Sequence, residues 1–150
     1  MERRAIRRVL FLLGLGILFS GGWAPASRAA GDLSAQNPIV VEVRLGSRQG
    51  HLAFEPKELT FETGRLYKLV LINPSPVKHY FSALRFAAAV WTRKVQDAGM
   101  EVKGAIREIE LLPGKRAEWF FVPVQAGVFE LRCTIPGHAE AGMIGRVALR

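Results

Sequence analysis

Residues 133–143 read Cys-Thr-Ile-Pro-Gly-His-Ala-Glu-Ala-Gly-Met, which places a cysteine, a histidine and a methionine at the spacing C-x4-H-x4-M. Cys133 is the only cysteine of the 150 residues, and a second histidine, His79, lies far upstream. One soft thiolate, two imidazoles and a weak axial thioether are the donors of a mononuclear copper site that cycles between Cu(I) and Cu(II). The sequence therefore predicts one copper ion in a trigonal plane of His79, Cys133 and His138. Met143 would be the long axial ligand.

Each of these residues also has an ordinary structural interpretation. A single cysteine is often a small buried apolar residue, a lone histidine is more often structural than ligating, and a lone methionine is more often core filler. Their joint spacing, with Pro136-Gly137 before the histidine, favours the metal site over these alternatives. In an exported protein a single thiol cannot form an internal disulfide, and metal ligation would keep it deprotonated and tied up.

The residues that are absent narrow the chemistry further. A dinuclear copper site needs two bridging cysteines, whereas Cys133 is alone. A multicopper oxidase needs more histidines than the three in this chain, and His51 has no cysteine or methionine near it in sequence, so we interpret it as a surface residue. Zinc accepts cysteine and histidine, but methionine is a poor fourth ligand for it. We therefore expect a copper protein that is not an enzyme.

The N-terminus has the pattern of an export signal peptide. Four arginines among the first eight residues precede an apolar run over 9–19, and small residues follow it. Cleavage after Ala26 would leave a linker over 27–37 and one domain over 38–150. We therefore expect an exported protein in the periplasm or an equivalent extracytoplasmic space such as a lumen. If residues 1–26 stay uncleaved, their uncharged stretch would anchor the protein in the membrane.

The chain is basic, with a formal net charge of +8. From Ser27 onward, 17 Lys and Arg stand against 12 Asp and Glu, so part of the basic character belongs to the signal. The remaining positive charge either steers an acidic redox partner or only solvates the surface, and the scattered pattern favours solvation. No basic cluster interleaves with aromatic residues, so nucleic-acid binding is not expected. We expect a monomer that meets one redox protein as electron donor and another as electron acceptor.

Short runs of alternating or β-branched apolar residues recur along the domain and predict strands. They cover residues 38–45, 59–61, 66–72, 105–111, 116–122, 128–132 and 144–149. The stretch between Ser82 and Gly99 is instead rich in alanine, which favours a helical insert over 82–99. Short strands at this spacing predict an all-β protein built as an antiparallel sandwich.

The ligand spacing suits a loop between two neighbouring strands. One strand would end at Cys133, and Pro136-Gly137 would turn the chain. Gly142 and Gly145 would let the chain fold back close to the metal. His79 would arrive from another strand end at the same pole. A rigid sandwich would then hold the ligands still while copper gains or loses an electron.

With these residues the chain resembles the cupredoxins, the superfamily of plastocyanin and azurin. Phe54 to Gly64, Leu66 to Asn73 and His79 are similar to the N-terminal half of that family, and Cys133 to Gly145 is similar to its ligand loop. The wording Cys-Thr-Ile-Pro-Gly-His and Gly-Met-Ile-Gly most resembles the loop of rusticyanin, sulfocyanin and auracyanin. The resemblance implies a Greek-key β-sandwich, one type 1 copper and one-electron shuttling between larger redox complexes.

The chain departs from the family pattern at two positions near the predicted site. Many cupredoxins have an asparagine after the first histidine that tethers the two ligand segments, whereas Tyr80 stands there in this chain. An aromatic residue is common two positions before the cysteine, where this chain has Leu131. The insert over 82–104 is either a partner surface or a cover over the sandwich, and the bulky Trp91 favours a cover.

Three functions agree with these features. An exported electron carrier is favoured because Cys133 supplies a thiolate that stays on the metal through redox cycling. A copper-delivery protein, such as a chaperone or assembly factor, would release its metal and tends to use methionines and histidines without a buried thiolate. An accessory cupredoxin domain of a membrane redox complex would be favoured by an uncleaved N-terminal segment.

Overall fold

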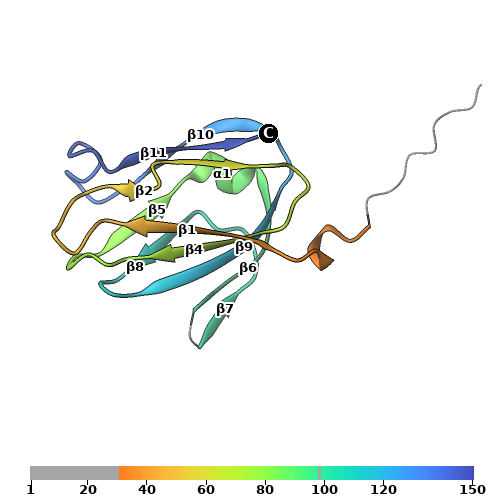
Figure 1. Cartoon of the computed structure of the whole chain (residues 1–150), viewed down its shortest axis with the longest axis horizontal. Coiled ribbons are helices and arrows are strands. Elements are labelled where there is room, and N and C mark those ends of the chain that lie inside the picture. The colour runs from red at the N-terminus through yellow and green to blue at the C-terminus, as the bar shows by residue number, and fades with distance from the viewer. Residues whose placement is uncertain (1–30, 98) are drawn as a thin grey trace, which may run out of the picture.

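The computed structural model describes residues 31–97 and 99–150, and in this part of the chain two β-sheets pack face to face (Figure 1). The predicted all-β sandwich is therefore confirmed. The predicted export signal at 1–26 lies outside the described residues. No helix within the described ranges has both the length and the apolar character that a membrane crossing requires.

The first sheet, called sheet A, has the strand order β2-β1-β4-β9-β6-β7. Its strands are β1 (Ile39–Leu45), β2 (Phe54–Glu55), β4 (Tyr67–Ile72), β6 (Val90–Asp97), β7 (Met100–Val102) and β9 (Arg116–Pro123). The second sheet, called sheet B, has the order β3-β11-β10-β5-β8. Its strands are β3 (Glu58–Phe61), β5 (His79–Ser82), β8 (Glu108–Leu111), β10 (Gly127–Arg132) and β11 (Ile144–Leu149).

The sequence predicts an antiparallel sandwich, but the two sheets contain both parallel and antiparallel strand pairs. β1 pairs with β4 in parallel, and β3 pairs with β11 in parallel, whereas the other strand pairs are antiparallel. Parallel neighbours cannot be joined by a tight hairpin and need a longer connection. Between β1 and β4 the chain passes through β3 of sheet B, and between β3 and β11 it passes through strands of both sheets. As a result, the ends of strands that are distant in sequence lie together at the same end of the sandwich.

Alternation along the strands fills the space between the sheets. In β9, Trp119 and Phe121 are buried while Glu118 and Phe120 are partly exposed. Both buried rings pack edge-on against Phe86, with ring centroids 5.4 and 5.3 Å apart. Aromatic pairs in this arrangement add to the gain from burying apolar surface. The interior is therefore a closely packed base for the loops at either end.

The predicted helical insert over 82–99 is wrong in its extent. Among the described residues of the insert the only helix is α1 (Leu84–Ala88), and the chain enters β6 two residues later. The alanines favour helix locally, but β-branched residues such as Val90 and Val95 suit a strand, and pairing with β9 buries both side chains. Trp91 is 48% exposed on β6, so it does not cover the core, and Trp119 fills the interior instead.

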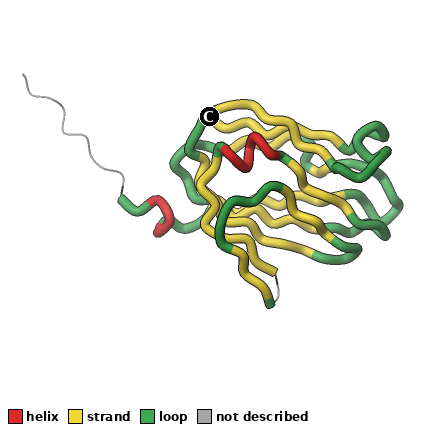
Figure 2. Tube along the Cα trace, turned by 180° about the vertical axis from the view of Figure 1, so that it is seen from behind, coloured by secondary structure: helices red, strands yellow, loops and turns green. Residues whose placement is uncertain are grey.

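One end of the sandwich gathers the strand ends that carry the predicted ligands. β5 begins at His79, β10 ends one residue before Cys133, and β11 begins one residue after Met143. Figure 2 shows the loops of this pole gathered at the right-hand end, away from the short 3-10 helix at Leu33–Ala35. That short helix lies within the predicted linker and is held to β6 by the Arg93 guanidinium, which donates to the Ser34 carbonyl.

Candidate metal centre

The loop between β10 and β11 carries three of the predicted ligands. The two strands are antiparallel neighbours with Arg132 opposite Ile144, so Cys133 and Met143 follow from the ends of the pairing. The Cys133 N–H donates to the Met143 carbonyl at 3.1 Å, and the Met143 N–H donates to the His138 carbonyl at 2.9 Å. The loop is therefore closed by its own backbone.

Glycine permits the turns of this loop. Gly137 has a φ of 83° and Gly142 has a φ of 105°, both in the region that side chains with a Cβ rarely adopt. Gly145 has a different role from the predicted one of bringing the loop close to the metal. A Cβ at Gly145 would lie 2.6 Å from the Lys57 carbonyl oxygen, so this glycine lets β11 pack against the chain that leads into β3.

His79, Cys133 and His138 come together at the pole, with their donor atoms all within 4.8 Å of one another. The Cys133 Sγ lies 3.4 Å from the His138 Nδ1 and 4.0 Å from the His79 Nδ1, and the two Nδ1 atoms are 3.2 Å apart. In the part of the chain that the structure describes, no other set of three His, Cys, Asp or Glu side chains is placed to hold a metal ion.

The candidate centre is almost dry. His79, Cys133 and Met143 are at most 1% exposed, whereas His138 is half-buried. Met143 belongs to the same core cluster as Cys133, with Leu131 packed beside them in that cluster. A thiol, two imidazole nitrogens and a buried thioether are soft and borderline donors that suit copper better than the hard cations Mg²⁺ or Ca²⁺. The residues at this pole therefore fit the predicted metal.

The lowered pKa of His79 also suits a metal ligand, because it keeps the imidazole neutral. Burial, and to a smaller extent the neighbouring His138, lower the pKa of His79 to about 4. The imidazole is therefore neutral near pH 7 and keeps a lone pair for a metal ion. Its Nε2 atom is buried and has no hydrogen-bond partner among the described residues.

The position of His79 depends on two residues that the sequence analysis did not single out. The first is Asn73, which is fully buried at the end of β4. Its Nδ2 donates to the carbonyls of Val77 and Leu111, both at 2.8 Å, and its Oδ1 accepts from the Ser75 N–H at 2.9 Å. Asn73 thus fixes the segment before His79 against β8. An asparagine that caps the backbone two residues later is the Asx-turn pattern, which is the one signal of this role in the sequence.

The second residue is Gly46, directly after β1. Its φ is 74°, and a Cβ there would lie 2.6 Å from the His79 Nε2 and 3.0 Å from the Ser75 Cβ. Only a glycine lets β1 end this close to the imidazole ring. The sequence gives no warning of this contact, because Gly46 follows a strand of sheet A while His79 begins a strand of sheet B.

Tyr80 supplies a direct link between the two ligand segments, although it is not the expected asparagine. Its backbone N–H donates to the Cys133 Sγ at 3.4 Å. A hydrogen bond to a sulfur stabilises the thiolate form that binds metal. The Tyr80 hydroxyl contributes nothing to this link, because it donates to Glu110 on the outer face of sheet B.

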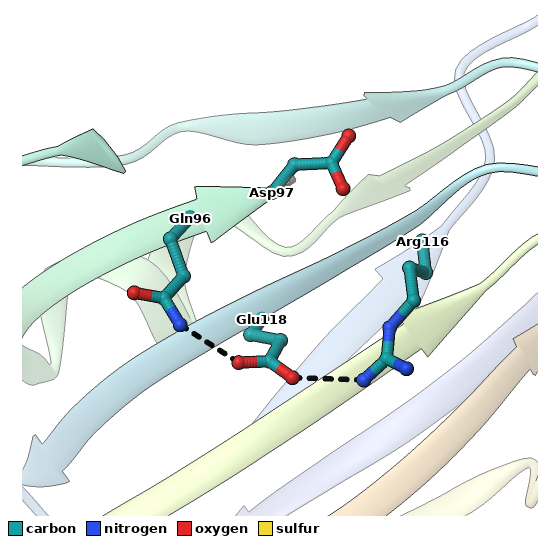
Figure 3. Close-up of a pocket in the computed structure, with 4 residues that line it drawn as sticks. All are labelled: Gln96, Asp97, Arg116 and Glu118. Carbon is teal, nitrogen blue, oxygen red and sulfur yellow. Dashed lines mark hydrogen bonds and ion pairs between the residues drawn. The ribbon is translucent and has the colours of Figure 1, made fainter. Parts of the chain in front are cut away.

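A surface pocket on sheet A has a different character. It is lined by Gln96, Asp97, Arg116 and Glu118 (Figure 3). The Glu118 carboxylate accepts from Gln96 at 2.9 Å and from Arg116 at 2.8 Å, and Lys68 pairs with it at 2.8 Å. These contacts lower the pKa of Glu118, with the Lys68 hydrogen bond contributing most. The pocket is lined by hydrogen bonds and ion pairs that meet at Glu118, from its own strand β9 and from the neighbouring strands β4 and β6, and it brings together no soft donors.

Curated proteins of similar sequence include a copper-resistant cuproprotein and a plastocyanin. No protein-family model matches the chain. The chain is 33% identical to the copper-resistant cuproprotein CopI of Rubrivivax gelatinosus over 103 residues, which cover 66% of this chain and 61% of that protein. It is 30% identical to chloroplastic plastocyanin of Silene latifolia subsp. alba over 129 residues, which cover 85% of this chain and 71% of the plastocyanin. The chain therefore spans less than two thirds of the length of this CopI.

A solved structure gives the same fold. The dithionite-reduced auracyanin of the photosynthetic bacterium Roseiflexus castenholzii matches with a TM-score of 0.52 and 18% identity, over 76% of this chain and 99% of that chain. Fold and donor set together define a small β-sandwich copper protein. The chain belongs to the cupredoxins, the family of type 1 blue-copper proteins, and its cofactor is copper. The prediction of a non-enzymatic protein is confirmed by this membership.

Proposed function

We propose that this cupredoxin carries single electrons between larger redox partners, with His79, Cys133, His138 and Met143 as the ligands of one type 1 copper. The observation that carries the proposal is the convergence of the three donor atoms within 4.8 Å at the end of a packed sandwich. Copper would supply the one-electron couple. A preformed site of this kind changes little between oxidation states, which favours fast transfer.

The residues around the site would have different roles in such an electron carrier. Buried Cys133 and Met143 keep water away, while the Tyr80 N–H orients the sulfur. His138 is the one half-buried member, so its ring would be the route by which an electron enters and leaves. Exposed Val77 and Pro136 lie in the segments that carry His79 and His138, and they would give the partner an apolar docking surface.

The first experiment tests the metal site. Purified protein would be loaded with Cu(II), and its visible absorption and electron paramagnetic resonance spectra recorded beside those of Cys133→Ser. We expect an intense thiolate-to-copper band and narrow hyperfine splitting that the variant lacks. A colourless wild type, or a copper signal that survives the loss of Cys133, would contradict the ligand set.

A second experiment tests the route of the electron. His138→Gly, supplemented with free imidazole to keep the metal bound, should exchange electrons with small redox reagents but more slowly with protein partners. Unchanged exchange rates with protein partners would remove His138 from the route. His51→Gly is the matched control, because His51 is exposed and is not part of the group that could hold a metal ion.

The second candidate function is copper handling, and the similarity to CopI, which is named for copper resistance, favours it. A copper-handling protein should give up Cu(I) to a chelator within the time of an encounter, whereas a carrier should retain copper through many redox cycles. Repeated reduction and reoxidation in the presence of a Cu(I) chelator separates the two functions. Progressive loss of the blue band would favour copper handling.

The compartment is part of the same proposal. The N-terminal pattern over 1–26 supports export to the periplasm or an equivalent lumen, where a redox protein donor and acceptor would be met. An uncleaved segment would make the protein membrane-anchored. Mass spectrometry of the mature N-terminus tests this, because cleavage after Ala26 predicts Ser27 as the first residue.

A further inference from the structure

The seam between β5 and β10 is the weakest pairing in sheet B, although it joins the two strands that supply His79 and Cys133. The pairing consists of one residue pair, Arg132 opposite Ser82. By contrast, β10 pairs with β11 over six residues, and β5 pairs with β8 over four. Backbone pairing between β5 and β10 therefore contributes little to holding the two ligand segments together.

Side chains bridge this seam just beside the metal site. The Glu108 Oε2 accepts from the Ser82 Oγ at 2.7 Å and from the Thr134 Oγ1 at 3.2 Å, and the two hydroxyl oxygens are 3.4 Å apart. Ser82 is the last residue of the strand that begins with His79, and Thr134 directly follows Cys133. We call the three residues, Glu108, Ser82 and Thr134, the carboxylate clasp.

The position of Glu108 makes the clasp a three-way connection. β8 is one of the two edge strands of sheet B, and Glu108 stands directly opposite Ser82 in its register. The carboxylate therefore lies on β8, one hydroxyl on β5 and the other on the ligand loop. Hydrogen bonds to an ionised acceptor are stronger than those between neutral groups. One carboxylate oxygen thus fastens the loop of Cys133 to the strand of His79.

We propose that Glu108 is a positioning residue for the copper site, which rests on the ligand set proposed above. By holding Ser82 and Thr134 together, it fixes the Cys133 Sγ relative to the His79 imidazole. The sequence has no asparagine after His79, and the clasp ties the same two segments from a strand that supplies no ligand. Loss of the clasp should let the Cys133 loop shift away from β5.

The chain offers a matched control on the same strand. Glu110 is two residues along β8 and is also exposed, but among the described residues its carboxylate accepts from Tyr80 and Lys78 and not from the Cys133 loop. Glu108→Ala and Glu110→Ala each remove one negative charge from the same face. Glu108→Gln removes the charge but keeps an oxygen that accepts from both hydroxyls. Thr134→Val removes one arm of the clasp and keeps the shape of the side chain.

The test compares these variants in the copper-loaded protein. The readouts are the intensity ratio of the thiolate-to-copper absorption bands, the reduction potential and copper retention against a chelator. We expect Glu108→Ala to change the band ratio and to lower copper affinity about tenfold, the lower end for losing a group that orients a ligand. Thr134→Val should give part of the effect. Glu108→Gln and Glu110→Ala should keep the wild-type ratio.

Two outcomes would overturn the proposal. If Glu108→Ala matches Glu110→Ala in band ratio and affinity, the clasp does not position the site. If Glu108→Gln is as altered as Glu108→Ala, the effect belongs to the charge and not to the hydrogen bonds. A wild type without a thiolate-to-copper band would instead refute the proposed ligand set, and this outcome is visible before any variant is made.

Discussion

The two segments that supply the copper ligands are built in opposite ways. Cys133, His138 and Met143 come from one loop of consecutive residues, which closes on itself through backbone hydrogen bonds. His79 comes alone, and its place depends on Asn73 and Gly46, which belong to other parts of the chain. The internal geometry of such a loop should tolerate small changes within it, although its place against β5 depends on the carboxylate clasp. A segment that is held by buried long-range contacts should not tolerate them.

The largest effect should follow from Asn73→Ala. The change removes three side-chain hydrogen bonds of a fully buried residue and leaves the carbonyl of Leu111 without this partner. At about 1 kcal/mol for each bond, we expect a loss of about 3 kcal/mol of unfolding free energy. Urea unfolding of the metal-free protein, followed by circular dichroism, measures it.

Asn37→Ala is the control for this prediction, because Asn37 is exposed and lies before the first strand. It should change the unfolding free energy by less than about 0.5 kcal/mol. Equal losses in the two variants would show that the His79 segment does not depend on the buried asparagine.

Gly46→Ala should have the next largest effect, and it should act on the site as well as on stability. The new Cβ would need a left-handed backbone and would lie 2.6 Å from the His79 Nε2. We expect a loss of about 2 kcal/mol of unfolding free energy. The displaced imidazole should also alter the electron paramagnetic resonance spectrum of the copper-loaded protein. Gly50→Ala is the control, since Gly50 has a φ of 83° with nothing within 4 Å.

Gly137→Ala makes the equivalent change in the other ligand segment. Gly137 has a φ of 83°, close to that of Gly46, but a Cβ there would meet nothing within 4 Å. Only the backbone strain is added, so we expect a loss of about 1 kcal/mol and an unchanged copper spectrum. A spectrum altered as strongly as in Gly46→Ala would mean that the Cys133 loop is the more fragile segment, which would reverse the comparison.

Much of the fold can be predicted from the sequence because strand periodicity is a local property. The alternation of Ile39, Val41 and Val43 predicts β1 within one residue of its observed start. The stretch 82–99 fails because its alanines favour helix locally, while β6 forms through pairing with β9, a partner more than twenty residues away. Periodicity also cannot tell that β1 pairs in parallel with β4 and β3 in parallel with β11, because strand order depends on packing.

The candidate site divides in the same way. Cys133, His138 and Met143 are visible because their spacing is a local pattern, and His79 is found only because histidines are few. Gly46 and Glu108 act through contacts with residues far away in sequence, so no spacing reveals them. For Asn73 only the local Asx-turn pattern is visible, and its bond to Leu111 is not. Tyr80 shows that an absent family residue does not mean an absent contact. The expected asparagine is absent, yet the backbone still donates to the sulfur.

The smallest effect should follow from Tyr80→Phe, which separates the backbone of this residue from its side chain. The change removes the hydroxyl that donates to Glu110 on the surface and leaves the N–H that donates to the Cys133 Sγ. Exposed polar contacts add little to stability, so unfolding should be unchanged within error. The energy of the thiolate-to-copper band and the reduction potential should also stay at their wild-type values. A shift in either would mean that the outer face of β5 reaches the sulfur through the Tyr80 ring, and the two ligand segments would then be coupled by a side chain as well as by the backbone.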